Sequence, residues 1–177
     1  MNEPVDPIGA VVRFYIQSGC PEVLKVETAD DMADAVGQLY PLETEHAVLV
    51  WNRIPVLLEY RYDIPVLLDD LVPLLEEIQR AEFSETRVYW GSDTFSTEWQ
   101  IRRDGELLRI DSRWMAVSGS YESLLNGRSQ LTVEIRSFVA EWLKVLRRIA
   151  YDLGAQSVRL EDHDIAVRVN ALLTPSH

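Results

Sequence analysis

The segment 94–117 constrains the fold most, because two runs of alternating apolar and polar residues flank the dipeptide Asp104-Gly105. An Asp-Gly pair between alternating runs is typical of a two-residue β-hairpin turn. With those two residues as the turn, Trp99 faces Ile110 across the hairpin, on a side that is otherwise apolar and aromatic. The opposite side is charged. The segment therefore predicts an antiparallel sheet with one face buried.

Two further segments, Ile64–Arg80 and Glu134–Leu153, carry apolar residues at helical spacing. Asp63 is expected to cap the first of these helices, and Pro73 to kink it or break it into two. With the hairpin, they predict an α+β fold: a mainly antiparallel β-sheet with two principal helices packed on one face. Weaker patterns predict a helix over Ala29–Tyr40, a loop over Ser118–Arg128, and strands over Val11–Gln17, Ala47–Trp51, Val56–Tyr62 and Thr86–Trp90 and in the tail at Ile165, Val167 and Val169.

The length of 177 residues fits a single globular domain over residues 1–177. Charge nevertheless divides the chain. Residues 1–85 contain 17 Asp and Glu against 5 Lys and Arg, whereas residues 86–177 contain 12 of each kind. An acidic N-terminal subdomain over 1–85, followed by an antiparallel sheet plus long helix over 86–177, is therefore the alternative organisation.

The formal net charge of −12 bears directly on the class of partner. Such a chain repels phosphates, so nucleic acid is not expected as a partner, and a basic protein surface is favoured. No apolar run is long enough to span a membrane, and the acidic, proline-broken start does not resemble a signal peptide. A single cysteine, Cys20, favours a reducing compartment, so we expect a cytoplasmic protein.

None of the familiar catalytic signatures occurs, so a non-enzymatic role is favoured and no cofactor is expected. Cys20 is interpreted as an incidental small residue. The run Glu161-Asp162-His163-Asp164 mixes oxygen and imidazole ligands, but neighbouring residues of a strand project to opposite faces. We therefore interpret this run as a solvated turn and expect no metal site.

The candidate partner-binding residues are four acids on one side of the helix predicted over 64–80, together with two tryptophans. The acids lie opposite the apolar stripe, where they can bind a basic patch; they are Asp69, Asp70, Glu76 and Glu77. Trp51 and Trp90 end their predicted strands and are candidates for aromatic anchors in an interface.

These features favour a non-enzymatic acidic protein that binds a basic partner protein; a bacterial immunity protein that neutralises a cationic toxin is one concrete version. One alternative is a small-molecule-binding domain or enzyme with its pocket between the predicted sheet and the long helix, for which Tyr60, Tyr62, Arg113 and Tyr121 are the candidate residues. Another is a homo-oligomeric structural module, such as a homodimer.

Overall fold

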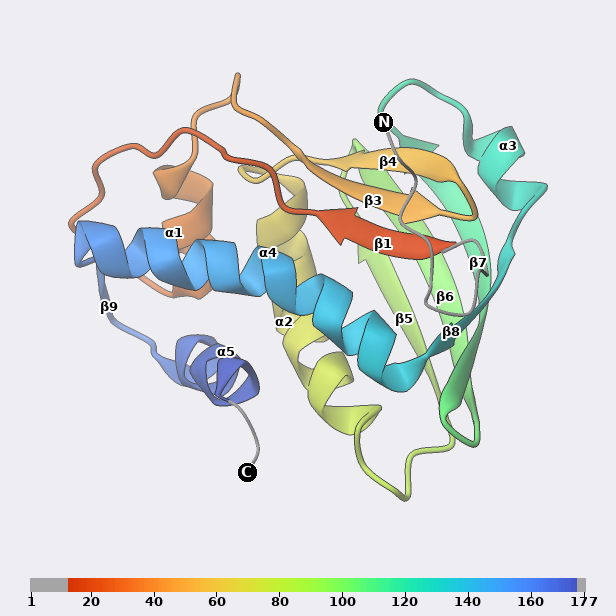
Figure 1. Ribbon diagram of the computed structural model, residues 1–177. Coiled ribbons are helices and arrows are strands. Elements are labelled where there is room, and N and C mark those ends of the chain that lie inside the picture. Colours follow the sequence, from red (N-terminus) through yellow and green to blue (C-terminus); the bar gives the residue numbers. More distant parts are fainter. Residues whose placement is uncertain (1–12, 175–177) are drawn as a thin grey trace.

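The computed structural model describes residues 13–174 (Figure 1). Its strands are β1 (Phe14–Gln17), β2 (Thr28–Ala29), β3 (Ala47–Trp51), β4 (Ile54–Leu58), β5 (Glu85–Gly91), β6 (Phe95–Asp104), β7 (Leu107–Val117), β8 (Gln130–Glu134) and β9 (Arg159–Leu160). Its helices are α1 (Met32–Leu39), α2 (Asp63–Glu77), α3 (Glu122–Asn126), α4 (Ile135–Gln156) and α5 (Asp164–Leu173). The predicted α+β class with antiparallel sheet is confirmed. Positions 11 and 12 of the first predicted strand lie outside the described residues.

The larger sheet has the order β5-β6-β7-β8, with every neighbouring pair antiparallel. The predicted hairpin is present, but its register is wrong, because Trp99 faces Ser112 instead of Ile110. The turn begins at Gly105, whose φ of +62° only glycine adopts without strain, while Asp104 stays in β6. Since the register moves by an even number of residues, each side chain keeps its predicted face, and Trp99 and Ile110 are both buried.

The smaller sheet has the order β1-β3-β4 and is also antiparallel. Its β3–β4 hairpin turns at Asn52 and Arg53, which have φ of +48° and +69°. Two successive positive φ values define a type I′ turn, the two-residue turn whose twist matches paired strands. The turn is therefore shorter than the gap over 52–55 between the two predicted strands, and Ile54 already belongs to β4.

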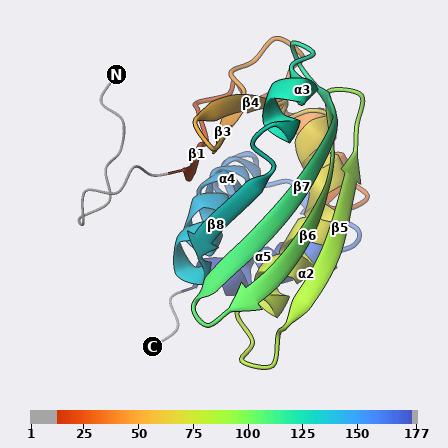
Figure 2. The ribbon, with the colours of Figure 1, turned by 90° about the vertical axis from the view of Figure 1, so that its right-hand side faces the viewer.

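A cluster of aromatic rings forms the core where the two sheets and α4 meet. Trp51 of β3 lies 5.0 Å from Trp99 of β6 between ring centroids, and Trp90 of β5 lies 6.3 Å from Trp142 of α4. Figure 2 shows α2 and α4 on one side of the larger sheet, as predicted. Trp99, Trp142 and Phe138 are fully buried in the space between this sheet and α4. These side chains occupy the place that the alternative hypothesis assigned to a ligand.

Helix α2 runs unbroken over 63–77, so the break, one of the two outcomes predicted at Pro73, does not occur. The missing N–H of Pro73 removes a single backbone hydrogen bond, to the carbonyl of Asp69. On the opposite side of the same turns, Leu71 and Leu75 are buried in the core. Their packing holds the helix together across the proline.

Asp63 is the first residue of α2 rather than the flanking cap that the sequence predicted. Its side chain is 1% exposed. The carboxylate accepts hydrogen bonds from the backbone N–H of Glu59 at 2.8 Å, from the hydroxyl of Thr94 at 2.7 Å and from the hydroxyl of Ser92. Asp63 thus ties the start of α2 to the loop between β5 and β6.

The C-terminal part of the chain differs most from expectation. The predicted final strand is wrong, because residues 164–173 form the helix α5. Ile165 and Val169 lie one helical turn apart and pack toward the core, whereas Val167, between them, is 63% exposed. The segment 118–128, predicted as a loop, contains α3, and β8 adds a strand that no pattern indicated.

Segments from the two halves of the chain are interleaved. β2 pairs in parallel with β9, and the backbone N–H of Ile16 in β1 donates to the carboxylate of Glu141 in α4 at 2.7 Å. The hydroxyl of Tyr40, at the end of α1, donates to Asp152 of α4 at 2.9 Å. Burial and this carboxylate raise the pKa of the Tyr40 phenol, which stays protonated as a donor. Residues from both halves share one hydrophobic core.

Replacing the buried carboxylate of Asp63 should be costly. Asp63→Ala leaves three part-buried donors without their shared acceptor, so we expect the free energy of unfolding to fall by about 3 kcal/mol. The exposed Asp93 has no hydrogen bond among residues 13–174, and Asp93→Ala should cost less than about 0.5 kcal/mol. Urea unfolding followed by circular dichroism measures both changes; equal losses would contradict the clamping role of Asp63.

Candidate functional site

Four carboxylates from three separate segments line one cleft of about 350 Å³. Asp31 precedes α1 and Asp69 lies in the middle of α2. Asp162 lies in the β9–α5 connection, and Asp164 is the first residue of α5. The other lining residues are apolar, and no basic side chain lines the cleft. Its four acids are Asp31, Asp69, Asp162 and Asp164.

Local backbone structure fixes two of these acids. Asp31 is the N-cap of α1, and its carboxylate accepts the backbone N–H of Asp34 at 2.8 Å. Asp162 accepts the backbone N–H of Asp164 at 2.9 Å, just before α5. The helix predicted from Ala29 therefore begins later, after Asp31, because Ala29 belongs to β2. In both connections a carboxylate that organises the backbone also faces the cleft.

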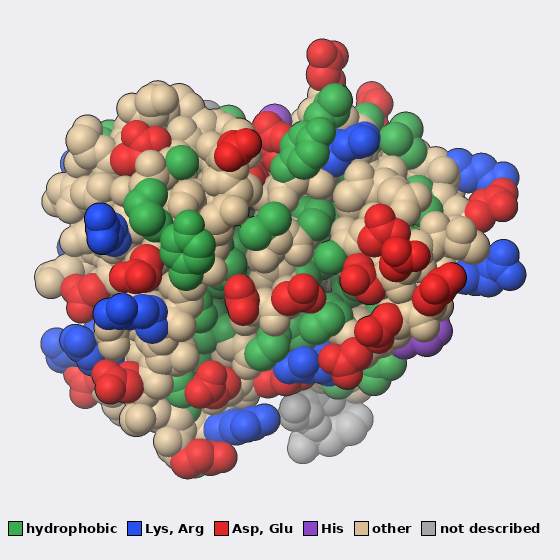
Figure 3. Space-filling view, turned by 180° about the vertical axis from the view of Figure 1, so that it is seen from behind, with side chains coloured by type: hydrophobic (Ala, Val, Ile, Leu, Met, Phe, Trp, Pro, Cys, Tyr) green, Lys and Arg blue, Asp and Glu red, His purple; other side chains and the backbone are tan. Residues whose placement is uncertain are grey.

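The acids of α2 predicted as partner-binding residues are positioned differently from one another. Asp69 and Asp70 are exposed, and neither has an ion pair among residues 13–174; Glu77 is exposed as well. We define the acidic face as Asp31, Asp69, Asp70, Asp162 and Asp164. In Figure 3, acidic side chains gather on the half of the molecule that holds α1 and α5, whereas the opposite edge mixes acidic and basic side chains.

Glu76 is bound by an arginine of the C-terminal half, so it is not free to meet a partner. The guanidinium of Arg168 in α5 donates to both carboxylate oxygens of Glu76, at 3.1 Å and 2.7 Å. These hydrogen bonds lower the pKa of the Glu76 carboxyl. Arg168 also lies 3.4 Å from Asp164, at the edge of the acidic face. The pair joins α2 to α5.

The prediction that Trp51 and Trp90 are exposed anchors is wrong. Their side chains are 0% and 1% exposed. Trp51 packs against Trp99 of the larger sheet, whereas Trp90 packs against Trp99 and, from α4, Trp142. The sequence did not indicate Val66 and suggested Tyr62 only for a ligand pocket, yet the two residues are 45% and 51% exposed. Val66 lies on α2 one turn before Asp70, and Tyr62, the N-cap residue, lies one turn before Val66, so their i, i+4 spacing was the available signal.

No protein-family model matches the chain, and no curated protein or solved structure matches it. Within residues 13–174, no helix has both the length and the apolar character needed to cross a bilayer. No group of three or more His, Cys, Asp or Glu in the same residues is arranged to hold a metal ion.

Breaking the pair between Glu76 and Arg168 should raise the pKa of Glu76 toward its usual value. Because the folded-state pKa is depressed, the pair stabilises the fold above the unfolded pKa of about 4.3, and this contribution is lost as the pH falls through the folded-state pKa. Arg168→Gln should therefore lower the free energy of unfolding by at most about 1 kcal/mol at neutral pH. The difference from wild type should vanish in strongly acidic solution.

Carboxyl-detected NMR titration measures the pKa, and urea unfolding at several pH values measures the stability. Arg147, which is exposed and has no ion pair among the described residues, provides the control Arg147→Gln. A Glu76 pKa that is the same in wild type and Arg168→Gln would refute the assignment.

Proposed function

We propose that this protein binds the cationic surface of a partner protein through its acidic face. The observation that carries the proposal is the cleft in which four carboxylates meet without a basic side chain in the lining. Like charges gathered at one place repel one another, and a cationic side chain that enters the cleft relieves that repulsion. A lysine or arginine of a partner is the matching group.

Net charge supports the same partner class. With a formal charge of −12, the molecule attracts basic proteins over distances comparable with the Debye length and speeds their capture. The concave shape of the cleft focuses this field on the acidic face. Neutralising a cationic toxin, as an immunity protein does, is one concrete form of the proposed activity.

The helix α2 offers contacts that can add affinity beside the charges. Tyr62 and Val66 are exposed on the same side of the helix as Asp70. Exposed tyrosines and aliphatic side chains next to charged groups are typical of interface centres, where they supply buried area while the charges supply orientation. They replace Trp51 and Trp90 as the proposed anchors.

Reversing charge on the acidic face should abolish capture of a basic partner. The variant Asp69→Lys/Asp70→Lys changes two exposed acids of α2, while Glu43→Lys/Glu82→Lys makes the same change in net charge at two exposed acids outside the cleft. We expect wild type and the control to retain the same basic protein from lysate of the source organism, identified by mass spectrometry. The α2 variant should lose it, and added salt should weaken the retention.

Circular dichroism checks that both variants keep the fold. Retention that is equal in the two variants, or that does not respond to salt, would contradict the proposal. Light scattering of the wild-type protein tests the homodimer alternative independently.

A further inference from the structure

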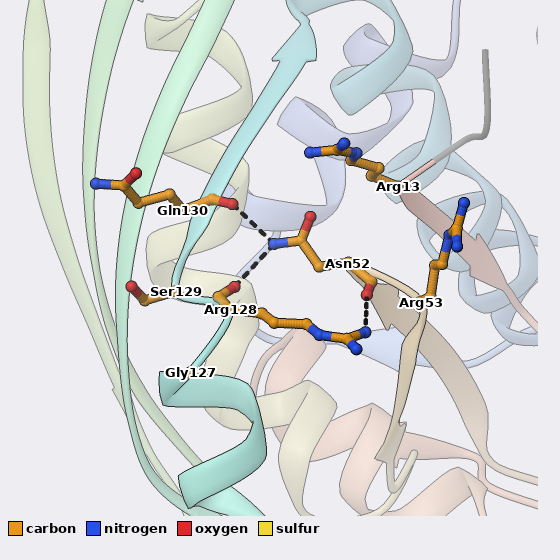
Figure 4. A pocket seen from close by; sticks show the side chains of 7 residues that line it. All are labelled: Arg13, Asn52, Arg53, Gly127, Arg128, Ser129 and Gln130. Atoms are coloured by element: carbon orange, nitrogen blue, oxygen red, sulfur yellow. Dashed lines mark hydrogen bonds between the residues drawn. The ribbon is translucent and has the colours of Figure 1, made fainter.

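A second cavity, of about 500 Å³, has the opposite charge. It lies between the β3–β4 turn and the loop that joins α3 to β8 (Figure 4). Its lining residues include three arginines and no acid: Arg13, Asn52, Arg53, Gly127, Arg128, Ser129 and Gln130. In a chain whose first 85 residues hold only five basic residues, two of those five, Arg13 and Arg53, meet here.

Asn52 holds the three arginine-bearing segments together. Its backbone N–H donates to the carbonyl of Arg13 at 2.7 Å, and its side-chain amide donates to the carbonyls of Arg128 and Gln130, both at 2.8 Å. The indole N–H of Trp51 donates to the same Arg128 carbonyl at 2.9 Å. Asn52 is 9% exposed, so these bonds fix the floor of the cavity. Figure 4 shows the arginine side chains around Asn52, while the amide of Gln130 points away.

The turn that carries Arg53 is strained. Arg53 has a φ of +69°, in the left-handed region that costs a residue with a Cβ about 1 kcal/mol or more. Glycine is the favoured residue at this second position of a type I′ turn. Arg53 places its side chain at the rim of the cavity, but its backbone conformation lowers local stability. Strained backbone that positions a side chain in this way occurs at binding sites.

The three guanidinium groups are free of carboxylates among residues 13–174. Arg13 and Arg53 have no ion pair there, and Arg128 donates only to the backbone carbonyl of Asn52, at 3.2 Å. Some other arginines of the chain are paired with acids; Arg109 lies 2.6 Å from Asp104, for example. Three unpaired cations around one cavity leave their N–H donors available to an anion.

We propose that this cavity binds a small soluble ligand through a phosphate group. The planar fork of arginine donates two parallel hydrogen bonds to phosphate oxygens, and a phosphate dianion matches several guanidinium groups better than one carboxylate does. The volume lies within the range of small-molecule pockets. The net charge of −12 opposes docking on a nucleic acid or an anionic membrane, which favours a small free anion. The cavity shares no residue with the acidic face.

Calorimetric titration with inorganic pyrophosphate tests the site on the full chain. Arg53→Gln, which leaves every hydrogen bond of Asn52 in place, should raise the dissociation constant about tenfold. Arg13→Gln/Arg53→Gln should raise it about a hundredfold if the two contributions are independent. The control Arg87→Gln removes the same charge from β5, outside the cavity, and should bind as wild type does.

Equal affinity in wild type and Arg53→Gln, or an equal loss in Arg87→Gln, would overturn the proposal. A parallel arm uses sedimentation with phosphatidylcholine vesicles that contain phosphatidic acid, and separates a lipid headgroup from a free ligand. We expect no sedimentation. Binding to these vesicles without binding to pyrophosphate would overturn the assignment to a soluble ligand.

Discussion

The packing of indole rings at the meeting point of the two sheets and α4 is the contact on which the rest of the structure depends. Trp99 lies 5.0 Å from Trp51 and 4.9 Å from Trp90, so residues of three strands from two sheets contact one another there. Trp142 adds α4 to the same cluster. Large aromatic side chains bury much area per residue, and this burial outweighs the cost of the indole N–H groups of Trp90, Trp99 and Trp142, which lack a partner among the described residues.

Periodicity in the sequence predicted which face of each strand and which stripe of each long helix is buried, because burial favours an apolar residue at each position separately. It could not predict the hairpin register, which depends on whether glycine occupies the first or the second turn position. It also failed at Ile165, Val167 and Val169. So short a run of β-branched residues fits either period, and contacts of α5 with α2 and α4 decide the outcome. Burial of Trp51 depends on packing between the two sheets, and burial of Trp90 depends on packing against α4, neither of which a local pattern encodes.

Acidic and basic side chains are grouped by their position in the fold, and not by the half of the chain to which they belong. The division at residue 86 predicted an acidic surface from the first half, yet Asp162 and Asp164 come from the second half. Arg168, from that same half, binds Glu76. The sequence thus predicted Asp69 and Asp70 as exposed acids, but it could not show which acids share a cleft, since that depends on the pairing of β2 with β9. Arg13, Arg53 and Arg128 were equally invisible, because they are far apart in the chain.

Trp51 links the interior to the surface. Its ring belongs to the buried cluster, while its N–H is bonded to the carbonyl of Arg128 beside the cationic cavity. Indole emission responds to nearby electric fields, and rings about 5 Å apart exchange excitation energy efficiently. A change of charge at that rim therefore alters the light emitted by the coupled tryptophans. The fluorescence of the chain's own tryptophans thus reports a change of charge beside the cationic cavity.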